Sequence, residues 1–328
     1  WKDCVMVKPS IFVTRRWPEI VEHQLARDFN AVFNLGDKPL NASEFRDAIK
    51  NFDAVLPTVT DKLGSEVFDV NKARTKILGN YGIGYSHICE ASVQRLGVTV
   101  TNTPDMLSEC TADVAMTLML MTSRRASEGE REVRTGAWTG WHPTHLNDTK
   151  VSGKTLGIVG FGRIGREVAR RAHHGFGMKI LVQNCSLLCS KVLAEFDAIQ
   201  AENLEELLPQ CDFVSLHCSG DGKNRHLINA KRLGLMKPNA FLINTVQGKV
   251  IDERALVQAL TFETIGGAGL DVFDGEPHIA PDLYHCDKLV MLPHLGSVTR
   301  EAREAMGFRV LDNLKDFFEG RDPRDRVI

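Results

Sequence analysis

The chain has 328 residues, of which 43% are apolar and 25% charged, and its formal net charge is −2 at pH 7. The composition is that of an ordinary soluble globular protein, and the length favours two domains over one core. The small net charge gives no electrostatic case for binding nucleic acid or a membrane surface, and no apolar run reaches the length of a bilayer span.

Eight cysteines are scattered along the chain, with no C-x-x-C pair and no His/Cys cluster at zinc spacing. We therefore expect no metal site, and we expect the closest pair, Cys185 and Cys189, to be two reduced thiols. The amino end lacks a signal-peptide pattern, which predicts a cytoplasmic protein. The first residue is Trp1 rather than Met, so we expect the translated start to lie upstream.

Short β-type runs alternate with helical segments almost throughout, which predicts α/β architecture with parallel sheets. The first third of the chain offers strands near Ile11–Thr14, Ala31–Asn34, Ala54–Thr58, Thr75–Gly79 and Val98–Asn102. The helical segments between them include Pro18–Arg27 and Ser43–Ile49.

The pattern changes at Thr103 and Pro104, where Thr103 can cap a helix and Pro104 suits its first position. The stretch from Leu107 to Met121 is apolar nearly all round, which predicts a helix buried on most sides. A less regular arm with two tryptophans follows, from Gly129 to Lys154.

An apolar strand at Thr155–Val159 runs straight into a glycine-rich turn. Gly160, Gly162 and Gly165 have the spacing G-x-G-x-x-G, which allows a tight turn, approach of backbone to a pyrophosphate, and close helix packing. The amphipathic stretch Arg163–His174 follows, so the unpaired N–H groups of a helix start would face the diphosphate. A glycine triplet by itself is an ordinary turn, but this context predicts a dinucleotide site.

A regular series of strands follows, at Lys179–Gln183, Asp212–His217, Ala240–Asn244, Gly267–Val272 and Leu289–Leu292. A final helix from Thr299 to Gly320 has its apolar residues on one face. We expect two doubly wound parallel-sheet domains. Residues 105–297 would form a Rossmann nucleotide-binding domain, and residues 1–104 with 298–328 a smaller, flavodoxin-like catalytic domain.

Ligands of a doubly wound sheet bind beyond the carboxyl ends of its strands, so titratable residues at those ends are candidates for chemistry. His294 follows a late apolar strand, and a histidine is a natural proton donor to a ketone oxygen. Glu276 could orient that ring and stabilise its protonated form, or it could be a solvated loop carboxylate. Asp271 could accept a hydrogen bond from a nicotinamide carboxamide, or simply cap a turn.

Further motifs extend this pattern to nearly the whole chain: Gly82-Ile83-Gly84-Tyr85, Thr103-Pro104-Asp105, Ala112-Asp113, Trp138 with Trp141, His217-Cys218, and the strand-end segments 244–248, 269–277 and 293–297. Together with the glycine turn, they resemble the D-isomer-specific 2-hydroxyacid dehydrogenases. Within that family the chain is similar to the glyoxylate/hydroxypyruvate reductases, also called glycerate dehydrogenases.

The resemblance implies NADH- or NADPH-dependent reduction of glyoxylate or hydroxypyruvate to the D-2-hydroxy acid. It implies a homodimer with its substrate between the two domains, and a dimerisation arm near residues 129–154. His294 would be the acid/base and Glu276 its partner, the backbone amides of Ile83 and Gly84 would receive the substrate carboxylate, and Trp141 would wall the pocket, often from the neighbouring subunit. The implied cofactor-binding residues are Gly160, Gly162, Arg163, Ile164, Gly165, Asn184, Cys185, Cys218, Thr245, Asp271 and Gly296.

Gln247 departs from the family pattern, which places there an arginine that grips the substrate carboxylate and polarises the carbonyl. Losing a hydrogen bond to a charged group, worth roughly 1.5–3 kcal/mol, predicts about ten- to a hundred-fold weaker transition-state binding. Three explanations stay open: an impaired or engineered enzyme, a natural variant with a substitute cation, or imperfectly inferred residues, since Cys185 and Ser219 also break the pattern. Lys249 would share a face with Gln247 in an extended segment, although a solvent-exposed lysine is the simpler interpretation.

The segment Gln183–Ser186 decides the cofactor, and it has no acidic residue that would bind the ribose of NAD and repel a 2′-phosphate. It also lacks the arginine that NADP-preferring relatives place at Cys185, so NAD and NADP both stay open, and we expect NADP to be tolerated because no acidic residue repels its phosphate. The alternative function is an NAD(H)-binding sensor with little turnover, similar to the C-terminal-binding corepressors, and only Gln247 supports it. Because the chain stops at Ile328, we expect no carboxy-terminal regulatory domain.

Overall fold

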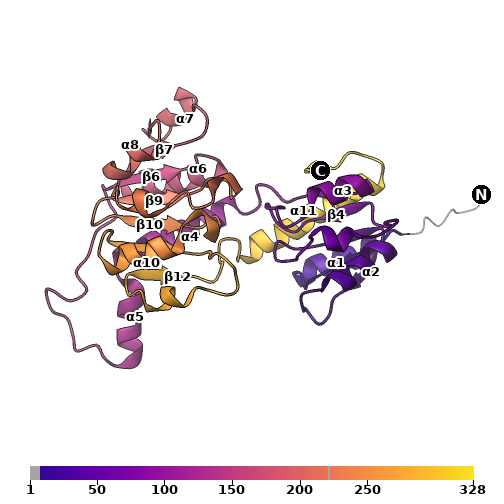
Figure 1. Cartoon of the computed structure of the whole chain (residues 1–328), viewed down its shortest axis with the longest axis horizontal. Helices are drawn as coiled ribbons and strands as arrows, with labels where there is room; N and C mark the ends of the chain where they lie inside the picture. Colours follow the sequence, from indigo (N-terminus) through magenta and orange to yellow (C-terminus); the bar gives the residue numbers. More distant parts are fainter. Residues whose placement is uncertain (1–7, 221) are drawn as a thin grey trace, which may run out of the picture. The chain divides into compact units, whose positions relative to one another are not determined.

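The computed structural model describes residues 8–220 and 222–328, so residues 1–7 of the predicted catalytic domain lie outside the described residues. The chain divides into two compact units. One joins the described residues up to Leu107 to Thr299–Ile328, and the other is Ser108–Val298. Each unit is a parallel sheet covered by helices, which confirms the predicted α/β fold with two parallel sheets (Figure 1). The catalytic and nucleotide-binding roles of the domains remain predictions.

The first unit has a five-stranded sheet in the order β2-β1-β3-β4-β5, the strand order of flavodoxin. All neighbouring strands are parallel. The strands are β1 (Ser10–Val13), β2 (Asn30–Phe33), β3 (Ala54–Leu56), β4 (Ile77–Gly79) and β5 (Thr99–Thr101).

Helices cover both faces of this sheet. The side chains of α1 (Glu19–Asp28) and α11 (Arg300–Phe318) share one buried cluster with the strands, and those of α2 (Ala42–Asn51), α3 (Glu90–Leu96) and the 3-10 turn η1 (Ser65–Phe68) share another. Met306, Val310 and Leu314 are buried on one face of α11, as predicted. A Cβ at Gly79 would collide with Val310, so the helix packs directly on the strand backbone.

The second unit has a seven-stranded parallel sheet in the order β12-β11-β10-β9-β6-β7-β8. Its strands are β6 (Thr155–Val159), β7 (Lys179–Gln183), β8 (Ile199–Gln200), β9 (Phe213–Leu216), β10 (Phe241–Asn244), β11 (Gly267–Leu270) and β12 (Leu289–Met291). The sequence analysis did not predict the two-residue β8. The order reverses between β6 and β9, and ligands of such sheets bind outside the strand ends at this switch point.

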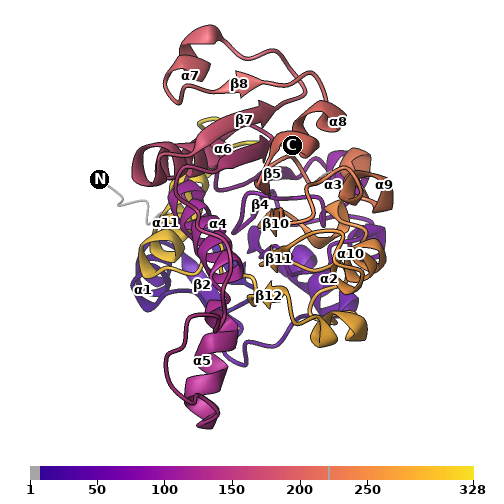
Figure 2. The same cartoon turned by 90° about the vertical axis from the view of Figure 1, so that its left-hand side faces the viewer.

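Helices α4 (Ser108–Ser123) and α6 (Arg163–Arg170) cover one face of this sheet, and α8 (Leu204–Leu207), α9 (Ala230–Leu233) and α10 (Glu253–Thr261) cover the other (Figure 2). The remaining short elements are the π-helical turn η2 (Arg171–Gly175), α7 (Ser190–Ala194), and the 3-10 turns η3 (Leu208–Gln210), η4 (Gly222–Asn224), η5 (Gly248–Val250) and η6 (Pro281–His285). None of the helices in the described part of the chain has the length and apolar character needed to cross a bilayer.

Two sequence predictions near α4 need correction. The helix begins at Ser108 rather than at Pro104, because the backbone of Asp105 is left-handed, with φ 72°, and interrupts the helical path. The helix is nevertheless buried on most sides, as predicted. The arm begins as a regular helix, α5 (Ala126–Thr135), which has no buried residue and therefore no apolar pattern to reveal it.

Candidate active site

The glycine turn joins β6 to α6, and each glycine meets a different steric demand. Gly160 has φ +92°, and a Cβ there would collide with the backbone of His217 and Cys218 after β9. A Cβ at Gly165 would collide with the carbonyl oxygen of Gly160, so this glycine lets the helix pack on the turn. A Cβ at Gly162 would meet nothing within 4 Å, and this glycine is exposed at the helix start. The tight turn at Gly160 and the close helix packing at Gly165 are as the spacing predicts, and the approach of a pyrophosphate at Gly162 stays a prediction.

The carboxyl edge of the seven-stranded sheet also holds buried polar atoms without partners in the described part of the chain. They are Nδ1 of His217, after β9, and Oγ1 of Thr245, after β10. Nε2 of His217 lies 2.8 Å from Oγ of Ser215, and burial lowers the pKa of His217 to about 3, so this ring stays neutral. An open glycine turn beside unsatisfied polar groups fits a polar ligand such as a dinucleotide.

Asn184 follows β7 and holds the glycine turn from the side. Its Oδ1 accepts a hydrogen bond from the N–H of Phe161 at 3.2 Å, and its Nδ2 donates to the backbone oxygen of Ser186 at 3.2 Å. Cys185 is exposed, and no carboxylate stands at this strand end. The structure therefore leaves NAD and NADP equally open.

His294 and Glu276, from different loops of the same edge, are brought together. Nδ1 of His294 lies 2.8 Å from Oε2 of Glu276, and Oε1 of Glu276 accepts a hydrogen bond from the N–H of Phe273 at 2.8 Å. Burial raises the pKa of Glu276, but the hydrogen bonds from His294 and Phe273 outweigh it, and the net pKa is lowered. An ionised carboxylate only accepts hydrogen bonds, so Nδ1 carries a proton and Nε2 is the nitrogen that can exchange one with a substrate.

Asp271 follows β11 and fixes the turn that contains His294. Its Oδ1 accepts from the N–H of Leu295 at 2.7 Å, its Oδ2 from the N–H of Gly296 at 2.8 Å, and its backbone oxygen from the N–H of His294 at 2.9 Å. His294 has φ 56°, a left-handed conformation that costs a non-glycine residue free energy. Asp271 thus occupies the turn-capping role, one of its two predicted alternatives. Burial raises its pKa, and the two amide hydrogen bonds oppose that rise.

Gln247, after β10, lies against the loop after β9: a Cβ at Gly220 would collide with its side-chain amide. The prediction that Lys249 shares its face is wrong, because Gly248–Val250 is a 3-10 turn rather than an extended segment. A Cβ at Gly248 would collide with the backbone of Phe273 and Asp274, so this glycine lets the loop after β10 touch the loop that carries Glu276.

Ile83 and Gly84 belong to the other unit, in a loop after β4 where the backbone oxygens of Gly82, Ile83 and Gly84 are hydrogen-bonded. Nδ2 of Asn80 donates to the oxygens of Gly82 at 3.1 Å and Gly84 at 2.9 Å, and Nδ2 of Asn102 donates to that of Ile83 at 2.9 Å. The N–H groups of Ile83 and Gly84 have no partner among the described residues. This arrangement suits the predicted reception of a carboxylate.

Trp141 lies in the loop after α5 and is 84% exposed, so within one chain it walls no pocket. The loop folds back on α5, where Nε2 of His145 lies 2.7 Å from Oε2 of Glu132. Figures 1 and 2 show α5 and this loop extending away from the seven-stranded sheet. Trp138, 52% exposed, and Val133, 63% exposed, lie in the same arm.

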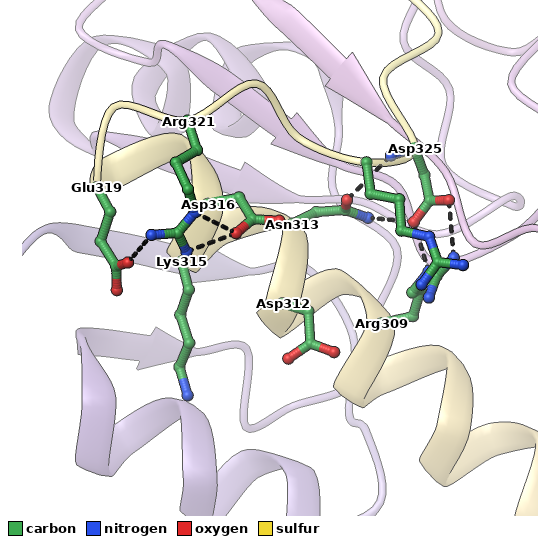
Figure 3. A pocket seen from close by; sticks show the side chains of 9 residues that line it. Arg309, Asp312, Asn313, Lys315, Asp316, Glu319, Arg321 and Asp325 are labelled. Carbon is green, nitrogen blue, oxygen red and sulfur yellow. Dashed lines mark hydrogen bonds and ion pairs between the residues drawn. The ribbon is translucent and has the colours of Figure 1, made fainter.

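A hollow of about 300 Å³ lies beside the end of α11 in the five-stranded unit, and it contains none of the predicted site residues. Arg309 pairs with Asp325, and Arg321 with Asp316 and Glu319 (Figure 3). These ion pairs tie the carboxy-terminal segment to α11 and already use the two guanidinium groups, so we assign the hollow a structural role.

The sequence analysis missed the residues that position the loops. Asn80 and Asn102 directly follow strands, and a place at a strand end was the signal that singled out Asp271 and the segment 244–248, but it was not used after β4 and β5. Glu253, the first residue of α10, accepts a hydrogen bond from the N–H of Asp274 and had no signal in its own segment beyond its charge.

The remaining cofactor residues predicted from the resemblance lie in this same unit: Arg163 and Ile164 begin α6, Cys218 follows β9, and Gly296 follows β12. The backbone oxygen of Gly296 accepts a hydrogen bond from Oγ1 of Thr111 in α4 at 2.9 Å. The structure therefore gathers every predicted cofactor residue, with His294, Glu276 and Gln247, at the carboxyl edge of one sheet.

Comparisons with known proteins show which family the chain belongs to. The family model for the NAD-binding domain of D-isomer-specific 2-hydroxyacid dehydrogenases matches residues 116–296. A glyoxylate reductase of Pyrococcus furiosus is 40% identical over 321 residues, which cover 97% of this chain and 94% of that protein.

Solved structures show the same similarity. A D-isomer-specific 2-hydroxyacid dehydrogenase from a Polaromonas species has TM-score 0.93 and 33% identity, with 98% of this chain and 100% of that chain covered. An NADPH-dependent glyoxylate/hydroxypyruvate reductase from Sinorhizobium meliloti, in complex with NADP and malonate, has TM-score 0.86 and 30% identity, with 98% and 97% covered.

Proposed function

Because the chain belongs to the D-isomer-specific 2-hydroxyacid dehydrogenase family, we propose that it reduces glyoxylate or hydroxypyruvate to the D-2-hydroxy acid. The single observation that carries the proposal is the hydrogen bond between Nδ1 of His294 and Glu276 at the carboxyl edge of the sheet that holds the glycine turn. NADH or NADPH, bound along that turn, would supply hydride to the carbonyl carbon of the substrate.

The residues of the chain supply the proton and orient the acid. Glu276 stabilises the protonated ring of His294, so that Nε2 can give a proton to the substrate oxygen as the hydroxy acid forms. Asp271 holds the backbone of His294 in the conformation that allows this. The amides of Ile83 and Gly84 receive the carboxylate in this proposal, as the family resemblance implies.

Gln247 can donate a hydrogen bond to the substrate but no charge, so we expect turnover that is weak for the family. Its side-chain amide lies against Gly220 in the loop after β9. The alternative, a sensor that binds NAD(H) with little turnover, rests on this residue only.

The proposal includes a homodimer in the cytoplasm, with the arm of residues 129–154 between subunits. The exposed side chains of Val133, Trp138 and Trp141 support it, because an apolar arm of this kind gains free energy by burial against a partner. The cytoplasmic location is carried over from the sequence argument.

The test follows the absorbance of NADH and NADPH with glyoxylate, hydroxypyruvate and pyruvate. We expect reduction of glyoxylate or hydroxypyruvate, and about ten- to a hundred-fold faster reduction by Gln247→Arg. Rates at the blank level that Gln247→Arg restores would indicate an impaired enzyme. Rates that stay at the blank level in this variant would favour the sensor.

A further inference from the structure

The loop that carries Glu276 is held at two consecutive backbone amides by two carboxylates. The N–H of Phe273 donates to Oε1 of Glu276, and the N–H of Asp274 donates to Oε1 of Glu253, each at 2.8 Å. The first hydrogen bond closes within the loop, whereas the acceptor of the second is the side chain of Glu253, the first residue of α10. Glu253 therefore ties the loop of Glu276 to a helix elsewhere in the sequence.

The start of α10, which carries Glu253, is held firmly in place. Oδ1 of Asp252 caps α10 by accepting a hydrogen bond from the N–H of Ala255 at 3.1 Å, and Ile251 and Leu256 on either side are buried. Gly248 packs against the peptide between Phe273 and Asp274. The loop backbone is thus confined by direct packing on one element and by a charge-assisted hydrogen bond from another.

The charges around Glu253 are unfavourable for a group that only stabilises the fold. Burial raises its pKa, the hydrogen bond from Asp274 N–H opposes this, and the charges of Asp274 and Glu276 raise it further. Asp274 is paired with Arg225 at 3.3 Å, and Glu276 with His294. A carboxyl group whose pKa is raised by burial and by neighbouring carboxylates is typical of functional sites.

We propose that Glu253 is a positioning residue of the active site, which holds the loop backbone where Glu276 can reach Nδ1 of His294. The kinetic test of this inference rests on the proposed function, because it measures reduction of a keto acid. The second test, a titration of the His294 ring, does not depend on that function. Glu253 touches neither member of the pair by a hydrogen bond of its own and acts through the peptide of Asp274.

The kinetic test compares Glu253→Ala and Glu253→Gln with the unaltered chain. We expect kcat to fall about tenfold in Glu253→Ala, with KM for the keto acid within twofold, because a hydrogen bond to a charged group is lost away from the substrate. Glutamine keeps an acceptor oxygen and should restore kcat to within about threefold. Glu263→Ala is the matched control, since Glu263 follows the same helix but pairs with Lys288 at the surface.

The second test is an NMR titration of the His294 imidazole, assigned with His294→Asn. Displacing Glu276 removes a partner that favours the protonated ring, so His294 should titrate at lower pH in Glu253→Ala. We expect Glu253→Gln and Glu263→Ala to titrate within a few tenths of a pH unit of the unaltered chain. Should the alanine variant not fold, Glu253→Asp, which withdraws the carboxylate by one methylene, is expected to behave as alanine does.

The two readouts separate failure of this inference from failure of the proposed function. An unchanged titration and unchanged kcat in Glu253→Ala would overturn the positioning role even in an active enzyme. A chain that reduces no keto acid, but whose His294 titration depends on Glu253, would refute the reductase and support the positioning role.

Discussion

The loops that hold His294 and Glu276 and the loop that holds Ile83 and Gly84 are fixed by opposite hydrogen-bonding groups. In the seven-stranded unit, carboxylates of Asp271, Glu276 and Glu253 accept from backbone N–H groups of the loops. In the five-stranded unit, amides of Asn80 and Asn102 donate to backbone oxygens of the loop after β4. Loops held by carboxylates place negative charge near His294, which favours its protonated form. A loop whose carbonyl oxygens accept hydrogen bonds from side-chain amides still has backbone N–H groups that can bind an anion.

The largest expected effect tests the proton-handling side of this comparison. His294→Asn removes the titrating ring, and we expect kcat/KM to fall about thousandfold, the contribution of a positioned acid. Binding of NADH, measured by fluorescence, should stay within twofold. A loss of tenfold or less would mean that the proton comes from another group.

Asp271→Ala removes the carboxylate that accepts from Leu295 and Gly296. It leaves their two N–H groups unsatisfied and Gly296 buried, so we expect the free energy of unfolding to fall by about 2–4 kcal/mol, measured in urea. Asp287→Ala, at an exposed position of the same unit, is the control and should change it by less than about 0.5 kcal/mol. Equal stability of the two variants would contradict the capping role.

Asn80→Ala tests the anion-receiving side. Losing the donors to Gly82 and Gly84 should loosen the loop, and we expect KM for the keto acid to rise about tenfold while kcat changes little. Asn51→Ala, on the exposed end of α2, provides the comparison. A fall in kcat with unchanged KM would place Asn80 with the proton-handling residues instead.

The smallest effect concerns a carboxylate at the opposite, amino edge of the five-stranded sheet. Hydrogen bonds from Arg74 lower the pKa of Asp53 to about 2 against the opposing effect of burial, with further hydrogen bonds from Ser10. The folded pKa lies below the unfolded value, so about 1–2 kcal/mol of stability is present above pH 4 and is lost as the pH falls towards 2. In Asp53→Asn this part of the pH dependence of unfolding should disappear, while turnover at neutral pH is unchanged.

Residues with a local signature could be predicted from the sequence. The glycine turn, the alternating strands and helices, and the placement of His294 and Glu276 at strand ends all depend on short segments. The positioning residues could not be found in this way, because Glu253 and Asp274, like Asn102 and Ile83, are about twenty residues apart in sequence and meet only when the loops pack. The helix α5 escaped prediction for a different reason, since no apolar face marks it.

The three hydrogen bonds that Asp271 accepts join the turn of His294 to the end of β11, so this turn is tied to the sheet. We expect any movement that admits a substrate or releases a product to occur in segments that are held by fewer hydrogen bonds than this turn. We therefore expect the backbone of His294 to stay fixed relative to β11, whichever segments move to admit a ligand.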